Sequence, residues 1–296
     1  MTTSQLMFLP ATRLLTVSLC ALTAGAFAQR TSSPAPRAAV EAIVAAERAF
    51  AQAALMQGTK AAFLATMADS AIVFSQAQPA LAHTVWSARP APTAAEPALH
   101  WGPAVAGAAA SGELGYSTGP WFIQTPEGKR VAYGQFFTIW ARQPDGRYRW
   151  LLDNGISHPL PAVVEPPAQV VYPAAGVVSK VAAPAATALD EQLTADATAQ
   201  GLPGAYAARL HPQARLLREG ALPLTTAEAI RQQLSAEAPR RFLPAGGRVA
   251  RSGELAYTYG TYQNTDAAAA RGSYVHLWQR GKTGWQLLAE VFNPAP

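Results

Sequence analysis

A nine-residue phrase occurs twice in this chain and limits the folds that the chain can adopt. SGELGYSTG occupies residues 111–119, and SGELAYTYG occupies residues 252–260, 141 residues later. Further matches join residues 72–74 to 215–217 and residues 140–142 to 278–280, at spacings of 143 and 138. The spacing shortens only between matched blocks, which is typical of two copies of one domain that differ in their loops, because loops tolerate changes of length. The sequence therefore predicts a tandem repeat.

The repeat and the composition divide the chain into four segments. Residues 1–28 place an arginine before an apolar run and end in the small-residue stretch AGAFA, the pattern of a secretory signal peptide cleaved after Ala28. The first copy is expected over residues 37–160 and the second over 186–296, joined by a proline- and alanine-rich linker at 161–185. The mature protein is therefore expected in the periplasm or outside the cell.

Composition excludes several classes of partner. Cys20 is the only cysteine and lies in the first segment, so no disulfide is expected. The 23 basic and 18 acidic residues are scattered, whereas a nucleic-acid-binding protein concentrates its basic residues on one face. After the first segment, no stretch is long and uncharged enough to span a membrane. The five histidines lack metal-ligand spacing and no G-x-G-x-x-G motif is present, so we expect no metal and no cofactor.

Periodicity predicts the order of elements within each copy. In the first copy, two helices are expected at residues 38–57 and 60–68, followed by strands at 72–75, 105–118, 131–141 and 147–154. Helices followed by a meander of antiparallel strands indicate an α+β domain, in which the helices cover one face of a curved sheet. In the second copy, Thr225 and Glu228 can form a capping box for a further helix. In the first copy, Pro90, Pro92 and Pro97 are expected to break that helix.

Several further motifs accompany the repeated phrase. They are Glu47-Arg48-Ala49-Phe50, Trp101-Gly102-Pro103, residues 111–121 and the segments that begin at Trp140 and Trp150, with looser matches at residues 252–260, 278–281 and 285–290. Together they resemble the nuclear transport factor two-like superfamily, which includes ketosteroid isomerase, SnoaL-like cyclases and many bacterial domains of unknown function. The resemblance implies two tandem cone-shaped domains, each a curved antiparallel sheet packed against N-terminal helices and holding a pocket. It implies no particular reaction, because members of one fold differ in chemistry.

Ser117 lies at the centre of a G-x-S-x-G pattern, the signature of a hydrolase nucleophile elbow. Such an elbow needs a strand, a strained turn and then a helix. Here Gly119-Pro120-Trp121 continues into extended chain, and the second copy has no serine at the corresponding place. We therefore interpret Ser117 as part of a strand rather than as a nucleophile.

Glu47 and Asp190 are acids within apolar helix faces. Helical spacing places Glu47 among Val40, Ile43 and Phe50, and Asp190 occupies the corresponding helix of the second copy. A buried acid with a raised pKa is suited to acid-base work. The alternative is that each acid is paired with an arginine or caps backbone groups.

Three further polar residues lie on the late strands. Alternation places Asp153 on the face of Arg149 and Leu151, away from Trp150, and it places Glu290 on the face of Leu288. His276 lies between Tyr274 and Trp278, where a histidine can do acid-base work or hydrogen-bond a ligand. Glu47, Asp153, His276 and Glu290 are thus the candidate catalytic residues. For each, the alternative is an ordinary structural role.

Aromatic residues provide the candidate ligand-binding surface. Together with Asp190, the candidates are Tyr116, Trp121, Trp140, Tyr257, Tyr259 and Tyr274. They could instead fill the cone. The two copies could also pack as an internal pseudo-dimer that buries Phe136, Trp140, Tyr274 and Trp278 at its seam, or the chain could form a homodimer.

Three functions follow as hypotheses. The first is an exported tandem-cone protein that binds a small apolar or amphipathic molecule. The second is a cofactor-free isomerase, cyclase or hydrolase, with Glu47 or Asp153 as the base and Tyr116 polarising the substrate. The third is a structural domain whose sheet faces serve assembly.

Overall fold

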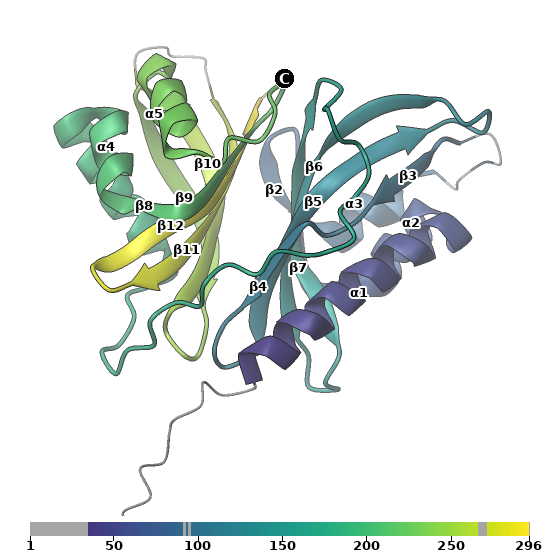
Figure 1. Cartoon of the computed structure of the whole chain (residues 1–296), viewed down its shortest axis with the longest axis horizontal. Helices are drawn as coiled ribbons and strands as arrows, with labels where there is room; N and C mark the ends of the chain where they lie inside the picture. The colour runs from purple at the N-terminus through teal and green to yellow at the C-terminus, as the bar shows by residue number, and fades with distance from the viewer. Residues whose placement is uncertain (1–34, 91–92, 94–95, 266–270, 296) are drawn as a thin grey trace, which may run out of the picture. The chain divides into compact units, whose positions relative to one another are not determined.

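Two sheets lie with one face toward each other and carry helices on their outer faces in a computed structural model of the chain (Figure 1). The structure describes residues 35–90, 93, 96–265 and 271–295. The predicted signal peptide and Cys20 lie outside these residues. Residues 34–296 cluster as one compact unit. The predicted α+β class is confirmed, with two sheets and five helices among the described residues.

The first half, residues 35–158, forms a seven-stranded sheet with three helices. Its elements are α1 (Ala35–Gln57), α2 (Thr59–Thr66), β1 (Met67–Ser75), β2 (Gln78–Leu81), α3 (Ala82–Ala88), β3 (Ala98–Trp101), β4 (Val105–Ala108), β5 (Leu114–Gln124), β6 (Arg130–Arg142) and β7 (Tyr148–His158). The strand order is β2-β1-β7-β6-β5-β3, and β4 also pairs with β5. Only β1 and β7 pair in parallel; the other neighbours are antiparallel.

The second half, residues 186–295, forms a five-stranded sheet with two helices. Its elements are α4 (Ala186–Arg209), β8 (Leu210–Arg218), α5 (Ala227–Ala236), β9 (Arg240–Val249), β10 (Leu255–Asn264), β11 (Arg271–Gly281) and β12 (Gly284–Pro294). The strand order is β8-β12-β11-β10-β9, and here too the first strand pairs in parallel with the last. Gly201 kinks α4 at a φ of 77°, and Gly58 separates α1 from α2 at a φ of 87°, because positive φ is readily accessible only to glycine.

Three details of the predicted elements were wrong. The expected strand at residues 105–118 is a hairpin of β4 and β5, because Gly112 adopts a positive φ and turns the chain back on itself. The helix expected to be broken in the first half exists as α3, which ends at Ala88, before Pro90. The N-cap of α5 is Thr226 rather than Thr225, and its hydroxyl accepts a hydrogen bond from the N–H of Ala229.

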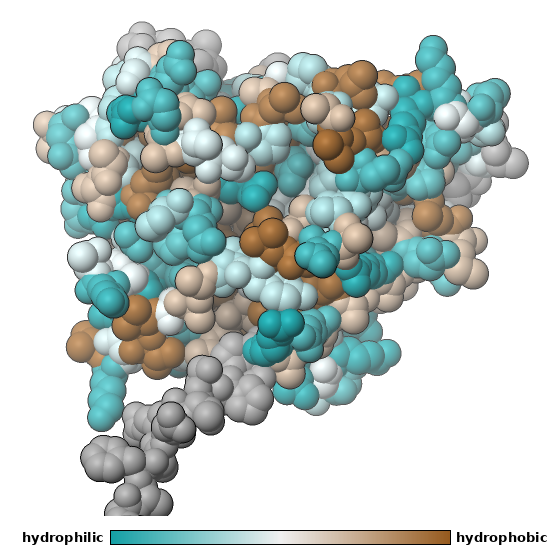
Figure 2. All heavy atoms as spheres, viewed as in Figure 1, coloured by the Kyte–Doolittle hydropathy of each residue, from teal (hydrophilic) through white to brown (hydrophobic). Residues whose placement is uncertain are grey.

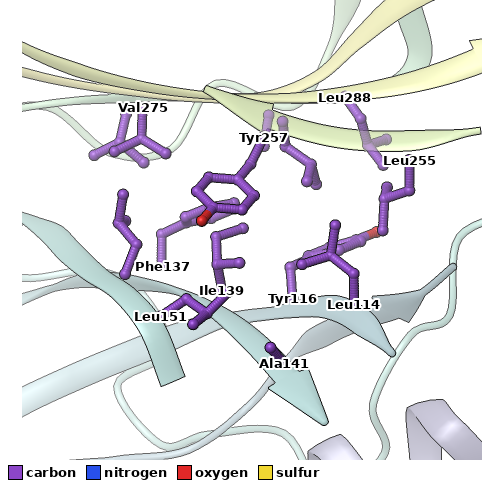
Figure 3. Close-up of a cluster of buried hydrophobic side chains, with 14 of the residues drawn as sticks. Leu114, Tyr116, Phe137, Ile139, Ala141, Leu151, Leu255, Tyr257, Val275 and Leu288 are labelled. Carbon is purple, nitrogen blue, oxygen red and sulfur yellow. The ribbon is translucent and has the colours of Figure 1, made fainter. Parts of the chain in front are cut away.

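The seam between the sheets is a continuous apolar core. Figure 3 shows Tyr116, Phe137 and Ile139 of the first sheet facing Tyr257 and Val275 of the second. The four aromatic residues expected at the seam, Phe136, Trp140, Tyr274 and Trp278, lie instead on the outer faces, toward the helices. A buried indole N–H needs an acceptor, and the helices provide acidic ones. The prediction therefore placed the contact between the two sheets on the wrong face of each sheet.

Because of a β-bulge, Asp153 lies on the opposite face of the sheet from the one predicted. On β6 and β7, Ile139 pairs with Leu152 and Trp140 pairs with Trp150, so Leu151 is left without a partner. Such an extra residue reverses the alternation beyond it. Asp153 therefore shares the helix-side face of Trp150, not the face of Leu151.

The second half has a bulge at the corresponding place. Leu277 pairs with Ala289 and Trp278 with Leu287, which leaves Leu288 unpaired. Glu290 therefore lies on the face of Leu287 rather than of Leu288. Both late-strand acids point toward the helices of their own half.

The segment between the halves packs against both of them. Val171 forms a parallel bridge with Val105, and its N–H donates to the carbonyl of Ala104 at 2.9 Å. Further along, the N–H of Val177 donates to the carbonyl of Arg280 at 2.7 Å. In the described part of the chain, no helix has the length and apolar character needed to cross a bilayer.

Candidate functional site

The first half contains a cavity of about 390 Å³ between its sheet and its helices. Most of its lining is apolar or aromatic: Phe50, Phe63, Val73, Phe74, Val85, Trp86, Leu99, Trp101, Trp121, Ile123, Phe136 and Ile156. Its polar lining comes from Arg89, Asp153, Asn154 and Ser157 of the first half and from Glu219 of the second half. Helices α1, α2 and α3, the inner strands and β3 thus enclose a space of the size and character of a small-molecule site.

Asp153 is the acidic side chain of β7 that faces this cavity. Its Oδ1 accepts a hydrogen bond of 2.8 Å from the hydroxyl of Thr138, which is fully buried on β6. Burial raises the pKa of Asp153 to about 7, the hydrogen bond from Thr138 opposes the shift, and the charge of Glu47 adds to it. Near neutral pH, this carboxyl can therefore both give and take a proton. Its Oδ2 has no hydrogen-bond partner among the described residues.

Arg89 lies at the other polar part of the lining. Its guanidinium stacks on the ring of Trp86, with the carbon Cζ 3.7 Å from the ring centroid. Trp86 in turn stacks on Phe63, so α3 and α2 are joined by an aromatic stack at the cavity wall. A cation held over an aromatic face is a fixed positive charge. The cavity thus has one cationic group, Arg89, and two carboxyl groups, Asp153 and Glu219, in a mostly apolar lining.

Glu47 lies behind the cavity wall rather than in it. Its carboxylate is fully buried and accepts hydrogen bonds from Trp101 Nε1 at 2.7 Å, Ser117 Oγ at 2.5 Å and Trp140 Nε1 at 3.2 Å. Burial raises the pKa of Glu47, and the three donors oppose the shift. Ser117 also accepts from Trp140 Nε1 at 2.8 Å. Glu47 therefore orients Trp101, which lines the cavity, and Ser117 is a hydrogen-bonded strand residue.

In the second half, Asp190 is the corresponding acid and its surroundings are filled. It accepts hydrogen bonds from Thr258 at 2.9 Å, from Tyr274 at 2.7 Å and from Trp278 at 3.2 Å, and Nδ1 of His276 lies 2.8 Å from its Oδ1. All five side chains are at least nine-tenths buried. Aromatic rings and a histidine thus occupy the space around this acid.

His276 connects Asp190 to a second acid, Glu290. Its Nε2 lies 2.8 Å from Glu290, which also accepts from the hydroxyl of Tyr206 at 2.5 Å and pairs with Arg218. Burial alone would lower the pKa of His276, but Asp190 and Glu290 raise it to about 9. Burial alone would raise the pKa of Glu290, but Arg218 and His276 hold it well below its usual range. His276 is therefore a protonated bridge between two carboxylates.

The remaining candidate residues are divided between these places. Trp121 lines the cavity of the first half. Tyr116 and Tyr257 lie in the seam, and Tyr259 packs against it, so they lie on the opposite sheet faces from the two buried acids. Trp140 and Tyr274 donate hydrogen bonds to those acids. Within the described ranges, no group of three or more histidine, cysteine, aspartate or glutamate residues is arranged to hold a metal.

Sequence reasoning missed the contribution of α3 to the cavity. Val85, Trp86 and Arg89 all come from this helix or its C-cap, a segment in which prolines were expected to prevent a helix. The helical spacing of Ala82, Val85 and Trp86, which ends before Pro90, is the signal that could have identified them.

No protein-family model and no curated protein matches this sequence. Solved structures similar to part of the chain are NTF2-like and ketosteroid isomerase-like proteins at low identity. An NTF-2-like protein of unknown function from Shewanella oneidensis MR-1 is 12% identical, with a TM-score of 0.31 over 36% of this chain and 95% of its own. A ketosteroid isomerase-like protein from Erwinia carotovora atroseptica SCRI1043 is 14% identical, with a TM-score of 0.30 over 37% and 93%. An NTF2-like protein of unknown function from Pseudomonas putida KT2440 is 17% identical, with a TM-score of 0.29 over 37% and 89%.

Proposed function

We propose that this is an exported tandem-cone protein whose first half binds a small apolar or amphipathic molecule in the cavity of about 390 Å³. The observation that carries the proposal is the lining. Its aromatic and aliphatic walls favour an apolar body, while Asp153 and Arg89 offer hydrogen-bonding and charged positions for a polar end. The ligand is expected to lie between α3 and the inner strands.

The comparison of the two halves supports this assignment. Beside Glu290, the late-strand acid of the second half, His276 and Tyr206 lie within hydrogen-bond distance of the carboxylate. Beside Asp153, the late-strand acid of the first half, the much smaller Thr138 occupies the position that corresponds to His276. A smaller side chain leaves space where the second half has a ring. We therefore assign ligand binding to the first half and a scaffold role to the second.

The tandem part of the proposal rests on matched details of the two halves. Both place their first strand parallel to their last, both have a glycine of positive φ that interrupts the N-terminal helical segment, and both have a bulge before the late-strand acid. We propose copies at residues 37–160 and 186–296 joined by residues 161–185. Export rests on residues 1–28, and mass spectrometry of protein recovered from the periplasm or medium should give a chain that begins at Gln29.

A cavity-filling variant tests the binding function. Ile123, on β5, lines the cavity and pairs with Leu99 of the neighbouring strand β3. In a thermal-shift screen of apolar and amphipathic compounds, wild-type protein should be stabilised by at least one compound, and Ile123→Trp should lose that stabilisation. Val131→Trp, at a half-exposed position on β6 outside the lining, is the matched control and should keep it. A wild-type response equal to that of Ile123→Trp would refute the proposal.

A second candidate function, a cofactor-free acid-base enzyme, is favoured by one observation. Asp153 combines a pKa of about 7 with a free carboxyl oxygen at the cavity, which suits a general base at neutral pH. Glu47 does not line the cavity, and Tyr116 lies on the other face of the sheet, so neither is retained as a reacting group. If turnover of a bound ligand is observed, Asp153→Asn should abolish it while ligand binding persists. Unchanged turnover in that variant would exclude this function.

A further inference from the structure

A second cavity, of about 270 Å³, lies at the seam and is bounded by both sheets and by the segment between the halves. Its lining includes Val105, Tyr116 and Thr118 from the first half, and Ala214, Arg215 and Leu288 from the second. It shares no lining residue with the cavity that contains Asp153. Anything bound here would therefore not compete directly with a ligand of the first half.

Arg215 is the cation of this cavity. It lies on β8 opposite Ala289 of β12, a residue of the apolar seam. The guanidinium is half-buried and forms no hydrogen bond or ion pair with any described residue. Burial lowers the pKa of Arg215, and the only other titratable side chain that influences it is Tyr116. A cation withdrawn from water without an acid is unfavourable unless something else supplies the negative charge.

The corresponding residue of the first half shows that the fold does not need a cation here. At the spacing of 143 that relates the two copies in this region, Arg215 corresponds to Ile72. Ile72 is an apolar residue on β1, which pairs in parallel with β7 as β8 does with β12. Of the two corresponding positions, only the one in the second half therefore carries a cation.

Tyr116 also lines this cavity. Its ring lies between the sheets (Figure 3), it is 3% exposed, and its hydroxyl has no hydrogen-bond partner among the described residues. Burial raises the pKa of Tyr116 far above neutrality, so the hydroxyl keeps its proton. Gly107 makes room for the ring, because a Cβ there would lie 2.5 Å from it. A guanidinium and a phenol without partners among the described residues thus lie at one cavity, whose remaining lining mixes apolar residues with Thr118, Gln213 and Thr225.

We propose that this seam cavity is a binding site for a small monocarboxylate, held by Arg215 and Tyr116. The planar fork of a guanidinium matches the two oxygens of a carboxylate, and the phenol adds a third donor. With one cation and no acid in its lining, the cavity favours a singly charged anion over a doubly charged phosphate, and Val105, Ala214 and Leu288 offer contacts to a hydrocarbon body. The site is independent of the ligand proposed for the first half.

Calorimetric titration with sodium benzoate and sodium hexanoate tests this site, with benzyl alcohol and hexan-1-ol as neutral counterparts. At least one carboxylate should bind, and its alcohol should bind about tenfold more weakly or not at all. Arg215→Met keeps the length of the side chain and removes its charge, so it should weaken carboxylate binding about tenfold or more, and Tyr116→Phe about threefold. Ile123→Trp, which fills the other cavity, should leave this binding unchanged.

The stability of the unliganded variants separates this site from a structural role of Arg215. Because an unpaired cation is removed from a partly buried position, Arg215→Met should unfold at the same or a higher temperature than wild type. Arg215→Ile, which copies Ile72, serves as a second variant if Arg215→Met does not fold. The proposal would be overturned if a folded Arg215 variant bound the carboxylates as tightly as wild type does. It would also be overturned if the alcohols or inorganic phosphate bound wild type as tightly as the carboxylates, or if wild type bound neither acid.

Discussion

The hydroxyl oxygens of Ser111 and Ser252 lie 2.7 Å apart, so the first residue of each copy of the repeated phrase is bonded to its counterpart. The contact is reciprocal, because each hydroxyl also accepts from the backbone N–H of the other serine, at 3.0 and 3.2 Å. Two residues further on, Glu113 accepts from the N–H of Arg251 and Glu254 accepts from the N–H of Ala110. The phrase that first suggested a hydrolase elbow is therefore a joint between the halves.

We expect the two glutamates of this joint to contribute equally to stability. Glu113→Ala and Glu254→Ala each leave a backbone N–H of the opposite half without its acceptor, and each should lower the free energy of unfolding by about 1–3 kcal/mol. Urea unfolding measures the change. Glu127→Ala, at an exposed turn, is the control and should change it by no more than about 0.5 kcal/mol. Losses no larger than this in both joint variants would contradict the expectation.

The serine pair allows a direct measurement of coupling across the joint. Ser111→Ala and Ser252→Ala each remove one hydroxyl of the pair, and the double variant removes both. A double-mutant cycle should give an interaction energy of about 1 kcal/mol, because the two residues are in direct contact. Additive effects would show that the hydroxyl contact does not contribute in solution.

Substitution of Glu47 by glutamine should destabilise the first half. The carboxylate accepts from two indoles and a hydroxyl, whereas an amide has one acceptor oxygen and would turn its NH₂ toward a donor. We expect a loss of about 2 kcal/mol in the free energy of unfolding. Glu41→Gln, in the same helix but exposed, is the matched control for denaturant unfolding. Equal stability of the two variants would show that Glu47 is not required as an acceptor.

The second half should lose stability at alkaline pH through His276. Its pKa is raised to about 9 in the folded state, from an ordinary value of 6.5, so the folded state holds this proton more tightly than the unfolded state does. The contribution is complete below pH 6.5 and is lost as the pH rises through 9, with a full size of about 3 kcal/mol. Chemical unfolding between pH 7 and 9.5 should show this slope in wild type and a flatter one in His276→Gln. Exposed His83, changed to glutamine, should keep the wild-type slope.

Asp153 should make the stability of the first half depend on pH in a lower range than His276 does for the second half. Its pKa is raised from 3.8 to about 7, so its contribution to stability is present below pH 3.8 and is lost as the pH rises through 7. Between pH 5.5 and 8, the melting temperature of wild type should therefore fall relative to that of Asp153→Asn. Asp69→Asn, an exposed change on the first strand, should follow the wild type. Parallel curves for wild type and Asp153→Asn would contradict the raised pKa.

The sequence predicted the elements better than the faces of its strands. Helical spacing and turn residues place α1, α2, β6 and β7 within a few residues of their observed bounds, because both signals are local. The bulges at Leu151 and Leu288 are not local signals: each depends on how two strands align, and one unpaired residue reverses every side chain beyond it.

Of the residues that the sequence singled out, Asp153 and Trp121 line the cavity, whereas Glu47, Asp190 and His276 do not. The sequence identified Glu47, Asp153, Asp190 and His276, since acids and a histidine within apolar segments are conspicuous. Whether each faces space or a packed neighbour depends on contacts between segments distant in the chain, such as the bond from Trp101 to Glu47 and the one from His276 to Glu290. Arg215 drew no attention, because a single arginine on a strand does not reveal whether an acid lies opposite.

The bulge at Leu151 also determines how easily the sheet of the first half could be simplified. Deleting that one residue would leave Trp150 opposite Trp140, Leu152 opposite Ile139 and Asp153 opposite Thr138, so the strand would become regular while the carboxyl kept its side of the sheet. A redesign could therefore shorten β7 by one residue at this point without exchanging any side chain that lines the cavity.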